Sequence, residues 1–399
     1  MRLEYPARKD CSERMLYLFT ACVLLVAYTY VLYPLAIGLL TRLWPRPMRP
    51  NGPIVTGVSF VMAARNEGLR IAQRIEEFKR QLSTAHVEGE VIVVLDGPDG
   101  PLHPALEQAG RKDRVLVLTL PQNQGKAAAI TVGAMRSTYE VLAFADVRQH
   151  WQDDALRQLL ENFRDPRVGA VSGELVLQQG QGVTEGVGIY WKYEKWLRSH
   201  EAIVDSVVGA TGAISAVRRE LFNGVPAGTV LDDVYWPLVV VMRGFRVVYD
   251  RGALAFDRLP ANANDEFRRK LRTLSGNYQL LTLLPSALLP WKNRIWLQYV
   301  SHKLLRLAVP WALLGAVIST GLMNTTFGRI LFWSQLLIYG SLLLTVVSGI
   351  AGRYRASSAA VSFIMLNVAA WLAFWVWISG NASKSWSSVQ YESQGSSDG

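Results

Sequence analysis

Cysteine is scarce in this chain. Only Cys11 and Cys22 occur among its 399 residues, and Cys22 lies inside a long apolar stretch. A disulfide framework and a cysteine-based metal cluster are therefore both excluded. The chain also lacks a basic surface interleaved with aromatic residues, so its formal net charge of +10 does not indicate a nucleic-acid partner. We expect this charge to face anionic lipid headgroups and phosphate groups instead.

Charged residues are missing from four long stretches of the sequence. No Asp, Glu, Lys or Arg occurs in 15–41, 307–328, 330–352 and 356–383. Each stretch exceeds the roughly 20 residues that a helix needs to cross a hydrocarbon core, and four buried core helices of this length would be unusual in a soluble domain. We therefore predict four transmembrane helices, at 15–43, 307–328, 330–352 and 358–380, with a tail at 1–14 and a flexible tail at 381–399.

The basic residues near the ends of these stretches indicate how the helices are oriented. Arg353 and Arg355 lie between the last two stretches, and Lys292 and Arg306 lie in the segment 286–306, which we interpret as interfacial. Because cytoplasmic loops carry an excess of Lys and Arg, we expect both regions in the cytoplasm. With four helices, the large polar region is then cytoplasmic and both termini are external. The prediction is a multi-pass protein of a cell membrane, such as a bacterial inner membrane.

A Pro-rich turn from Pro45 to Pro53 separates the first apolar stretch from a polar region that begins near Ile54. Short apolar runs alternate there with helical patterns, which predicts buried strands at 58–63, 91–95, 115–118 and 141–144. Strands and helices in this rhythm indicate an α/β fold with a largely parallel sheet. Ligands of such sheets bind beyond the carboxyl ends of the strands. Polar residues do cluster at those ends.

The first three predicted strands lead into possible ligand-binding loops. The first two strands are followed by Arg65, Asn66, Glu67 and Asp96. These residue types also form turns and helix caps. After the third strand, Gly125 and Lys126 open an Ala-rich helix, where backbone N–H groups and an ammonium group suit a diphosphate. An ordinary helix start is the alternative, because the Walker pattern is absent.

Carboxylates follow at two further positions. The fourth strand ends at Asp146 and Arg148, which suit a divalent cation and a phosphate, or alternatively a salt-bridged helix cap. Asp232 and Asp233 stand at the start of another predicted helix. Two carboxylates at that position either cap the helix or supply a general base for a hydroxyl.

The order of these signals resembles the inverting glycosyltransferases of family 2. The resemblance covers about residues 54–285 together with the surrounding membrane layout. It is strongest to the membrane-integrated branch, which includes cellulose, hyaluronan and poly-N-acetylglucosamine synthases and ceramide glucosyltransferase. It implies a GT-A nucleotide-sugar-binding domain at 54–285, with a Rossmann-like mixed sheet, next to the four transmembrane helices.

The resemblance also implies roles for individual residues. It places the sugar-nucleotide donor near Arg65, Asn66, Glu67, Asp96, Lys126, Asp146 and Arg148. Asp146 matches the first Asp of a metal-binding Asp-x-Asp motif, which implies bound Mg2+ or Mn2+. Asp233 matches the catalytic Asp, with Asp232 beside it, and Arg272 matches the Arg of a Gln-x-x-Arg-Trp motif. The acceptor region is similar at Gly209, Thr211 and Gly212, where a generic glycine turn is the alternative.

Three motif residues of the family are missing, and one of them is the Gln of the Gln-x-x-Arg-Trp motif, whose place Arg269 takes. Arg148 stands where the second metal-binding Asp is usual, so a cation replaces a metal ligand. Thr273 stands where processive members of the family place Trp, which favours transfer of one or a few sugars over synthesis of a long polymer.

These observations predict an inverting hexosyltransferase of the membrane. We expect it to transfer a sugar from a nucleotide sugar, a UDP-sugar by preference, to a lipid or glycan acceptor. Asp233 would act as the general base while the nucleoside diphosphate leaves toward Lys126 and Arg272. The first alternative is a processive polysaccharide synthase. The second is a catalytically silent membrane scaffold, which the changes at Arg148 and at 269–273 would suit.

Overall fold

An eight-stranded mixed sheet organises the polar part of the chain. The computed structural model describes residues 5–178, 185–258, 263–347 and 355–382. Its strands are β1 (Gly57–Ala64), β2 (Glu88–Asp96), β3 (Val115–Leu120), β4 (Val141–Phe144), β5 (His150–Trp151), β6 (Val168–Gln178), β7 (Ser215–Arg218) and β8 (Arg246–Arg258). Their spatial order is β3-β2-β1-β4-β7-β6-β8-β5.

The four strands predicted from apolar runs all form, and β3, β2, β1 and β4 pair in parallel. Helix α3 (Gly68–Ala85) follows β1, α4 (Pro104–Gly110) follows β2, and α5 (Lys126–Met135) follows β3. On the other side of β4, β7 pairs antiparallel with both β4 and β6, whereas β8 runs parallel to β6. The sheet is therefore mixed, as the GT-A resemblance implies.

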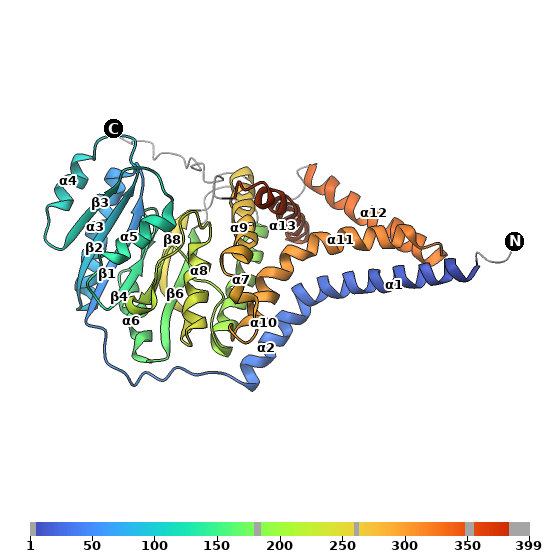
Figure 1. Cartoon of the computed structure of the whole chain (residues 1–399), viewed down its shortest axis with the longest axis horizontal. Coiled ribbons are helices and arrows are strands. Elements are labelled where there is room, and N and C mark those ends of the chain that lie inside the picture. The colour runs from blue at the N-terminus through green and yellow to red at the C-terminus, as the bar shows by residue number, and fades with distance from the viewer. Residues whose placement is uncertain (1–4, 179–184, 259–262, 348–354, 383–399) are drawn as a thin grey trace.

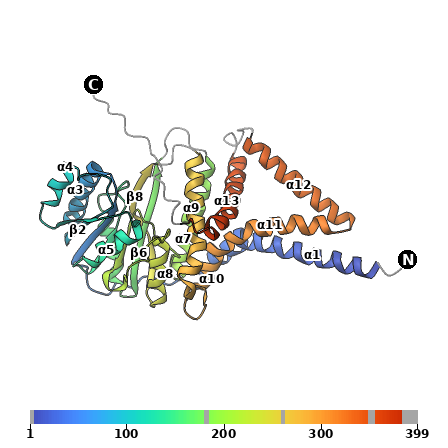
Figure 2. The same ribbon diagram turned by 45° about the horizontal axis from the view of Figure 1, so that its top comes forward.

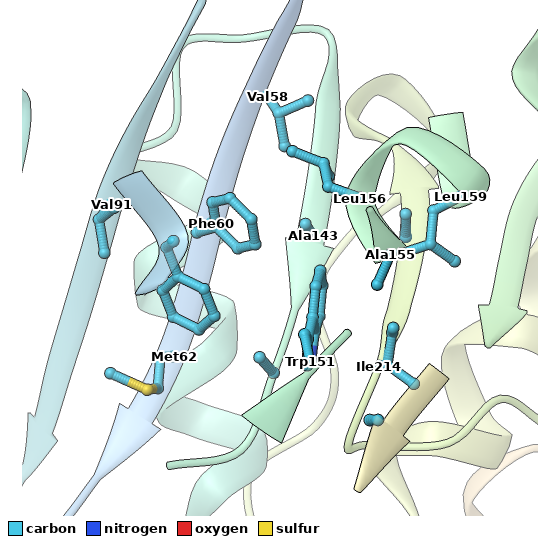
Figure 3. Packing of buried hydrophobic residues seen from close by; sticks show 14 of the residues in the cluster. Val58, Phe60, Met62, Val91, Ala143, Trp151, Ala155, Leu156, Leu159 and Ile214 are labelled. Carbon is cyan, nitrogen blue, oxygen red and sulfur yellow. The ribbon is translucent and has the colours of Figure 1, made fainter. Parts of the chain in front are cut away.

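Side chains of alternate residues on β1 build one face of the core. Val58, Phe60 and Met62 are at most 1% exposed and point to the same side of the strand (Figure 3). The Phe60 ring stacks on Phe78 of α3 with ring centroids 4.3 Å apart, and Trp151 contacts both rings. Because the sheet is covered on both faces, its central strands are apolar throughout, which is why they were visible as uninterrupted runs.

Long helices extend from one side of this domain (Figure 1). Within the described residues, three segments are long and apolar enough to cross a membrane: Cys11–Leu43, Trp296–Leu322 and Thr326–Thr345. The first comprises most of α1 (Tyr5–Ala27), a π-helical turn (Tyr28–Leu32) and α2 (Tyr33–Leu43). The second comprises α10 (Trp296–Tyr299), another π-helical turn and α11 (Leu305–Leu322), and the third lies in α12 (Thr326–Val347). Figure 2 shows α1 and α11 side by side, with α12 folding back toward the domain.

The prediction of four transmembrane helices is wrong, because only three segments of the described chain qualify. The fourth uncharged stretch forms α13 (Arg355–Ile378), whose apolar part within the described residues is the shorter segment Ser362–Ile378. This helix packs against α9 (Ala263–Leu283) and α7 (Glu185–Val204) of the domain. The ring of Trp377 stacks on that of Tyr278 in α9, with ring centroids 5.6 Å apart. Packing on the domain thus explains its apolar composition.

The basic, aromatic helices α7 and α9 stand between the sheet and the membrane-spanning candidates (Figure 1). Arg353, on which part of the orientation argument rests, and residues 383–399 of the predicted tail lie outside the described residues.

Candidate active site

The ammonium group of Lys126 joins three parts of the candidate site. Its Nζ atom lies 2.6 Å from Oδ1 of Asp146, which follows β4, and 3.8 Å from Oδ2 of Asp232, which starts α8 (Asp232–Met242). Lys126 itself is the first residue of α5. The carboxyl end of β4 and the first turns of two helices therefore converge on one charged cluster. The sequence predicted all three residues for this site.

The two carboxylates of α8 differ in exposure. Asp232 is 7% exposed, whereas Asp233 is only partly buried. Burial raises the pKa of Asp232 to about 6 and also raises the pKa of Asp233 above its usual value, while Lys126 opposes both shifts. Both side chains lie in the first turn of α8, where the helix dipole favours negative charge. Asp233 is therefore the carboxylate that a ligand reaches more easily.

Asp96 fixes the loop that leads to Lys126. Its side chain is buried, and its two oxygens accept hydrogen bonds from the backbone nitrogens of Gln124 and Gly125 at 2.7 and 2.8 Å. Gly125 has φ +88°, which disfavours a side chain. We had assigned Asp96 to the donor, and in this geometry it also positions the start of α5.

Arg65 and Asn66 connect the loops after β1 and β2. Asn66 and Asp99 exchange two hydrogen bonds: Asn66 Nδ2 donates to Asp99 Oδ2 at 2.5 Å, and the Asp99 backbone N–H donates to Asn66 Oδ1 at 3.0 Å. Arg65 pairs with the other Asp99 oxygen at 2.8 Å. The neighbouring Glu67 has its pKa raised by burial, although Arg70 and Arg148 lower it. The sequence analysis did not predict Asp99 as a site residue.

Arg148 forms a two-pronged ion pair with Asp257 of β8. Arg148 Nε lies 3.2 Å from Oδ1 of Asp257, and Nη2 lies 2.8 Å from Oδ2. The Asp257 side chain is only 4% exposed, and Gln149 donates a further hydrogen bond to it at 2.9 Å. The pair holds the guanidinium at the rim of the site in a defined orientation. Sequence reasoning missed Asp257, because it lies 109 residues from Arg148 in a strand without a motif.

The predicted acceptor segment touches the charged cluster directly. A Cβ atom on Gly212 would lie 2.6 Å from Lys126 Nζ and 3.5 Å from Asp146 Oδ2, so a larger residue would displace the ammonium group. A Cβ atom on Gly209 would lie 3.1 Å from the backbone oxygen of Asp233. Between them, the Thr211 backbone N–H donates to Ser172 Oγ at 3.1 Å. Both glycines thus permit the close approach of this segment to the catalytic candidates.

Arg272 reaches the site from α9. Its charge lowers the pKa of Asp232 and Asp233, so it lies within electrostatic range of both. Gln279 fixes the register of α9 by accepting a hydrogen bond from the Val230 N–H and donating one to the Gly228 oxygen, each at 2.9 Å. These contacts bind α9 to the loop that precedes α8. All the predicted catalytic candidates are therefore grouped around that loop.

One carboxylate is available for the predicted metal. The described residues contain no group of three or more His, Cys, Asp or Glu side chains placed to hold a cation. Arg148 takes the second position of the expected Asp-x-Asp motif and pairs with Asp257 instead. Asp146 remains, with its Oδ1 atom paired to Lys126 Nζ. A cation at this carboxylate would have to take its other oxygens from a bound diphosphate.

Comparison with known proteins identifies the domain. Residues 59–225 match the sequence model of glycosyl transferase family 2. The chain carries a family 2 glycosyltransferase domain. The match begins in β1 and extends past β7, so it includes Lys126, Asp146 and the acceptor segment. The resemblance to this inverting family is confirmed.

The curated relatives are distant. The poly-β-1,6-N-acetyl-D-glucosamine synthase of Staphylococcus aureus is 22% identical over 237 residues, covering 56% of this chain and 55% of the relative. The synthase of that name from Staphylococcus epidermidis is 19% identical over 233 residues, covering 57% and 56%. The chain therefore spans about half the length of the curated relatives that it matches.

The fold is similar to that of a solved enzyme. The mannosyltransferase PcManGT from Pyrobaculum calidifontis, in complex with GDP-Man and Mn2+, has a TM-score of 0.67 and 19% sequence identity. The similarity covers 90% of this chain and 99% of that one, so it includes helices outside the family 2 domain. It supports the GT-A-like sheet together with its helical extension.

Proposed function

We propose that this protein is a membrane-embedded inverting glycosyltransferase. It transfers a hexose from a nucleotide sugar to a lipid or glycan acceptor. The observation that carries the proposal is the contact of Lys126 with Asp146, both within the family 2 match at residues 59–225, and with Asp232, which follows the match. A UDP-sugar is the proposed donor. Because PcManGT was solved in complex with GDP-Man, a GDP-sugar is the second donor to test.

The reaction is a single displacement at the anomeric carbon. Asp233 accepts the proton of an acceptor hydroxyl, whose oxygen attacks the anomeric carbon from the side opposite the diphosphate. The bond from that carbon to the diphosphate oxygen breaks, and the nucleoside diphosphate leaves with the electron pair. Lys126 and Arg272 stabilise the negative charge that develops on the leaving group. The configuration of the sugar inverts.

The donor rests on the ends of β1, β2 and β4. Arg65 and Asn66 form the outer edge of this site with Asp99, while Asp96 holds the loop before Lys126. Arg148, oriented by Asp257, provides a further cation for a phosphate oxygen. The acceptor approaches along Gly209, Thr211 and Gly212.

We further propose that a divalent cation, Mg2+ or Mn2+, assists with the leaving group. Asp146 would supply one carboxylate oxygen, and the donor's diphosphate would supply others. When bound, the ion neutralises charge on the departing diphosphate. Arg148 carries part of that charge in place of the second Asp of the family motif.

The product is a short glycoconjugate in this proposal. Thr273 is exposed and donates its hydroxyl to the Arg269 carbonyl at 2.9 Å, so no bulky ring is present there to hold a growing chain. A processive synthase is the second candidate. It is favoured by the names of the Staphylococcus relatives.

The test is turnover of a panel of UDP- and GDP-sugars by the purified full chain in detergent, with membrane lipid extract as acceptor. We expect one donor to be consumed and one or a few sugars to be added to a lipid-soluble product, with a loss of rate after chelation. A ladder of high mass would favour the synthase. No turnover of any donor would refute the proposal and favour the scaffold alternative.

A further inference from the structure

A pocket lies where α7, α9 and α13 meet. Glu266, Arg269 and Lys270 of α9 form its charged wall, and Tyr190 and Trp191 of α7 form an aromatic wall. The third wall is α13, which contributes Met365 and Leu366. Figure 2 shows α13 between α9 and the membrane-spanning candidates α11 and α12. The pocket is therefore amphipathic, and its apolar wall belongs to a helix that also packs against those candidates.

The charged wall contains two cations and one carboxylate. Arg269 Nη2 lies 2.8 Å from Oε2 of Glu266, and Lys270 Nζ lies 3.5 Å from Oε1 of Glu266. The Lys270 ammonium also lies 4.8 Å from the centre of the Tyr190 ring. Glu194 of α7 also acts electrostatically on Lys270, so the two cations lie close together beside carboxylates of two helices.

Glu266 retains hydrogen-bonding capacity inside the pocket. Its side chain is 8% exposed, and within the described part of the chain neither carboxylate oxygen accepts a hydrogen bond, although both face cations. Burial also lowers the pKa of Lys270, which Glu266 partly offsets. Buried polar atoms with spare capacity are costly unless a ligand or water uses them. A hydroxyl group is the donor that a carboxylate between two cations accepts well.

The pocket lies about one turn along α9 from Arg272, which acts electrostatically on the two candidate carboxylates. Arg272 follows Arg269 by three residues, which is a rise of about 4.5 Å on the same side of a helix. Arg272 is within electrostatic range of Asp232 and Asp233. A molecule bound at Arg269 therefore lies about one helical turn from Arg272.

We propose that this pocket binds the phosphate-bearing headgroup of the acceptor lipid. The inference rests on the proposed glycosyl transfer and adds the chemical class of its acceptor. Arg269 and Lys270 pair with the phosphate, and Glu266 accepts a hydrogen bond from a headgroup hydroxyl. Met365 and Leu366 contact the first methylene groups of the lipid chain. Trp191 lies at headgroup depth, where amphipathic rings are favoured.

A soluble glycan acceptor fits these walls less well. Met365 and Leu366 present apolar surface to the pocket and offer a polysaccharide no hydrogen bonds. A free phosphate ion would use the cations but leave the apolar wall exposed. A lipid uses the cations, the carboxylate and the apolar side chains together.

The test measures binding of short-chain lipids to the purified full chain in detergent. The probes are dioctanoyl phosphatidylglycerol, dioctanoylglycerol, which lacks the phosphate, and glycerol 3-phosphate, which lacks the chains. We expect phosphatidylglycerol to bind at least tenfold more tightly than either. Arg269→Gln and Lys270→Gln should each raise its Kd about tenfold, the size expected for loss of a charge-assisted contact. Arg268→Gln, an exposed neighbour on the same helix, is the matched control and should leave Kd unchanged.

Three results would overturn the proposal. Equal binding of dioctanoylglycerol would mean that the phosphate is not recognised, and equal binding of glycerol 3-phosphate would mean that the chains are not. An equal rise of the Kd in Arg268→Gln would show that binding depends on general surface charge.

A kinetic experiment separates this inference from the function on which it rests. In the transfer assay, Arg269→Gln should raise the acceptor KM about tenfold and leave the donor KM unchanged. Transfer by the wild type with an unchanged acceptor KM in this variant would reject the pocket alone. Absence of wild-type turnover would reject the proposed function, while the binding experiment still decides whether the pocket takes an anionic lipid.

Discussion

At the scale of single residues, Asp232 and Asp233 are adjacent but occupy different environments. Asp232 is buried next to Lys126, whereas Asp233 retains partial exposure at the opening of α8. A general base has to be within hydrogen-bonding reach of the acceptor hydroxyl. This requirement favours Asp233, which the family resemblance had also selected.

Replacing Asp233 with Asn keeps the shape of the side chain but removes the basic oxygen. We expect Asp233→Asn to reduce the transfer rate about 100-fold to 10,000-fold, a loss of about 3 kcal/mol or more in transition-state stabilisation. Nucleotide affinity should change little, because Lys126 and Asp146 remain. Asp232→Asn is the matched comparison and should be milder. Transfer rate and nucleotide Kd are measured for both, and near-normal transfer by Asp233→Asn would leave Asp232 as the base to examine.

The pH dependence of transfer follows from the raised pKa values. The base acts only when deprotonated, so lowering the pH through the pKa of the pair removes the active form. Burial raises the pKa of Asp232 to about 6 and raises that of Asp233 as well. We expect kcat/KM to fall as the pH is lowered, at a pH above the ordinary carboxyl pKa, and to be level at higher pH until other groups titrate. A rate that stays constant down to pH 4, close to the ordinary carboxyl pKa, would contradict this prediction.

The sequence located the residues that follow strands but missed their distant partners. Lys126, Asp146 and Asp232 were found because turns, helix starts and strand ends have local signatures. Asp257 was missed because its role depends on β8 running beside β6, which brings it to Arg148. Pairing between strands far apart in the sequence leaves no pattern in a single chain.

At the scale of elements, a buried polar contact joins the domain to its membrane helices. His302, at the start of the α11 segment, lies between two carboxylates of α7. Its Nδ1 is 2.9 Å from Oε1 of Glu201, and its Nε2 is 3.0 Å from Oε2 of Glu194. The Tyr33 hydroxyl of α2 donates to Glu201 at 2.6 Å, and Arg306 pairs with Glu194. Helix α7 leads on to the acceptor segment, so this cluster sets where that segment lies.

Removing His302 should destabilise the junction between α7 and the membrane helices. Loss of one partner from a buried charged cluster costs about 3 to 5 kcal/mol. Of the contacts described above, His302→Ala leaves Glu201 only that with Tyr33 and Glu194 only that with Arg306. We expect His302→Ala to lower the free energy of unfolding by about 3 kcal/mol, measured with denaturant in detergent. His200→Ala is the control, since His200 contacts Trp196, one turn earlier in the same helix, through its backbone oxygen and its ring. Equal stability of the two variants would show that the cluster contributes little.

The four parallel strands and the helix starts could be predicted because apolar runs and capping residues are local features. The number of membrane-spanning helices could not be predicted in the same way. Helix α13 has the composition of a membrane span, but Tyr278 of α9 and other side chains of the domain provide an apolar surface for it. Hydropathy measures the need for burial and does not distinguish lipid from protein as the partner.

At the scale of the whole molecule, three spanning candidates change the predicted topology. One candidate precedes the family 2 domain and two follow it. An even number after the domain returns the chain to the side on which the domain lies, so the external placement predicted for residues after the last helix is withdrawn. Lys292 and Arg294 precede the second candidate, so from the positive-inside tendency we still propose that they and the domain face the cytoplasm.

A reporter fused after α13 tests this arrangement. We expect a fluorescent protein there to be active and alkaline phosphatase to be inactive, as both indicate a cytoplasmic position. The opposite pair of signals would mean that α13 also spans the membrane or that one of the three candidates does not.

The central claim is a single displacement by a family 2 glycosyltransferase, and the anomeric configuration of the transferred sugar tests it most directly. The purified chain is given the donor that it consumes, with the sugar in α linkage to the nucleotide, and the isolated product is examined by proton NMR. Inversion at one displacement predicts a β-linked sugar, formed by the wild type and strongly reduced in Asp233→Asn. An α-linked product from an α-linked donor, or consumption of the donor without any transferred sugar, would contradict the account.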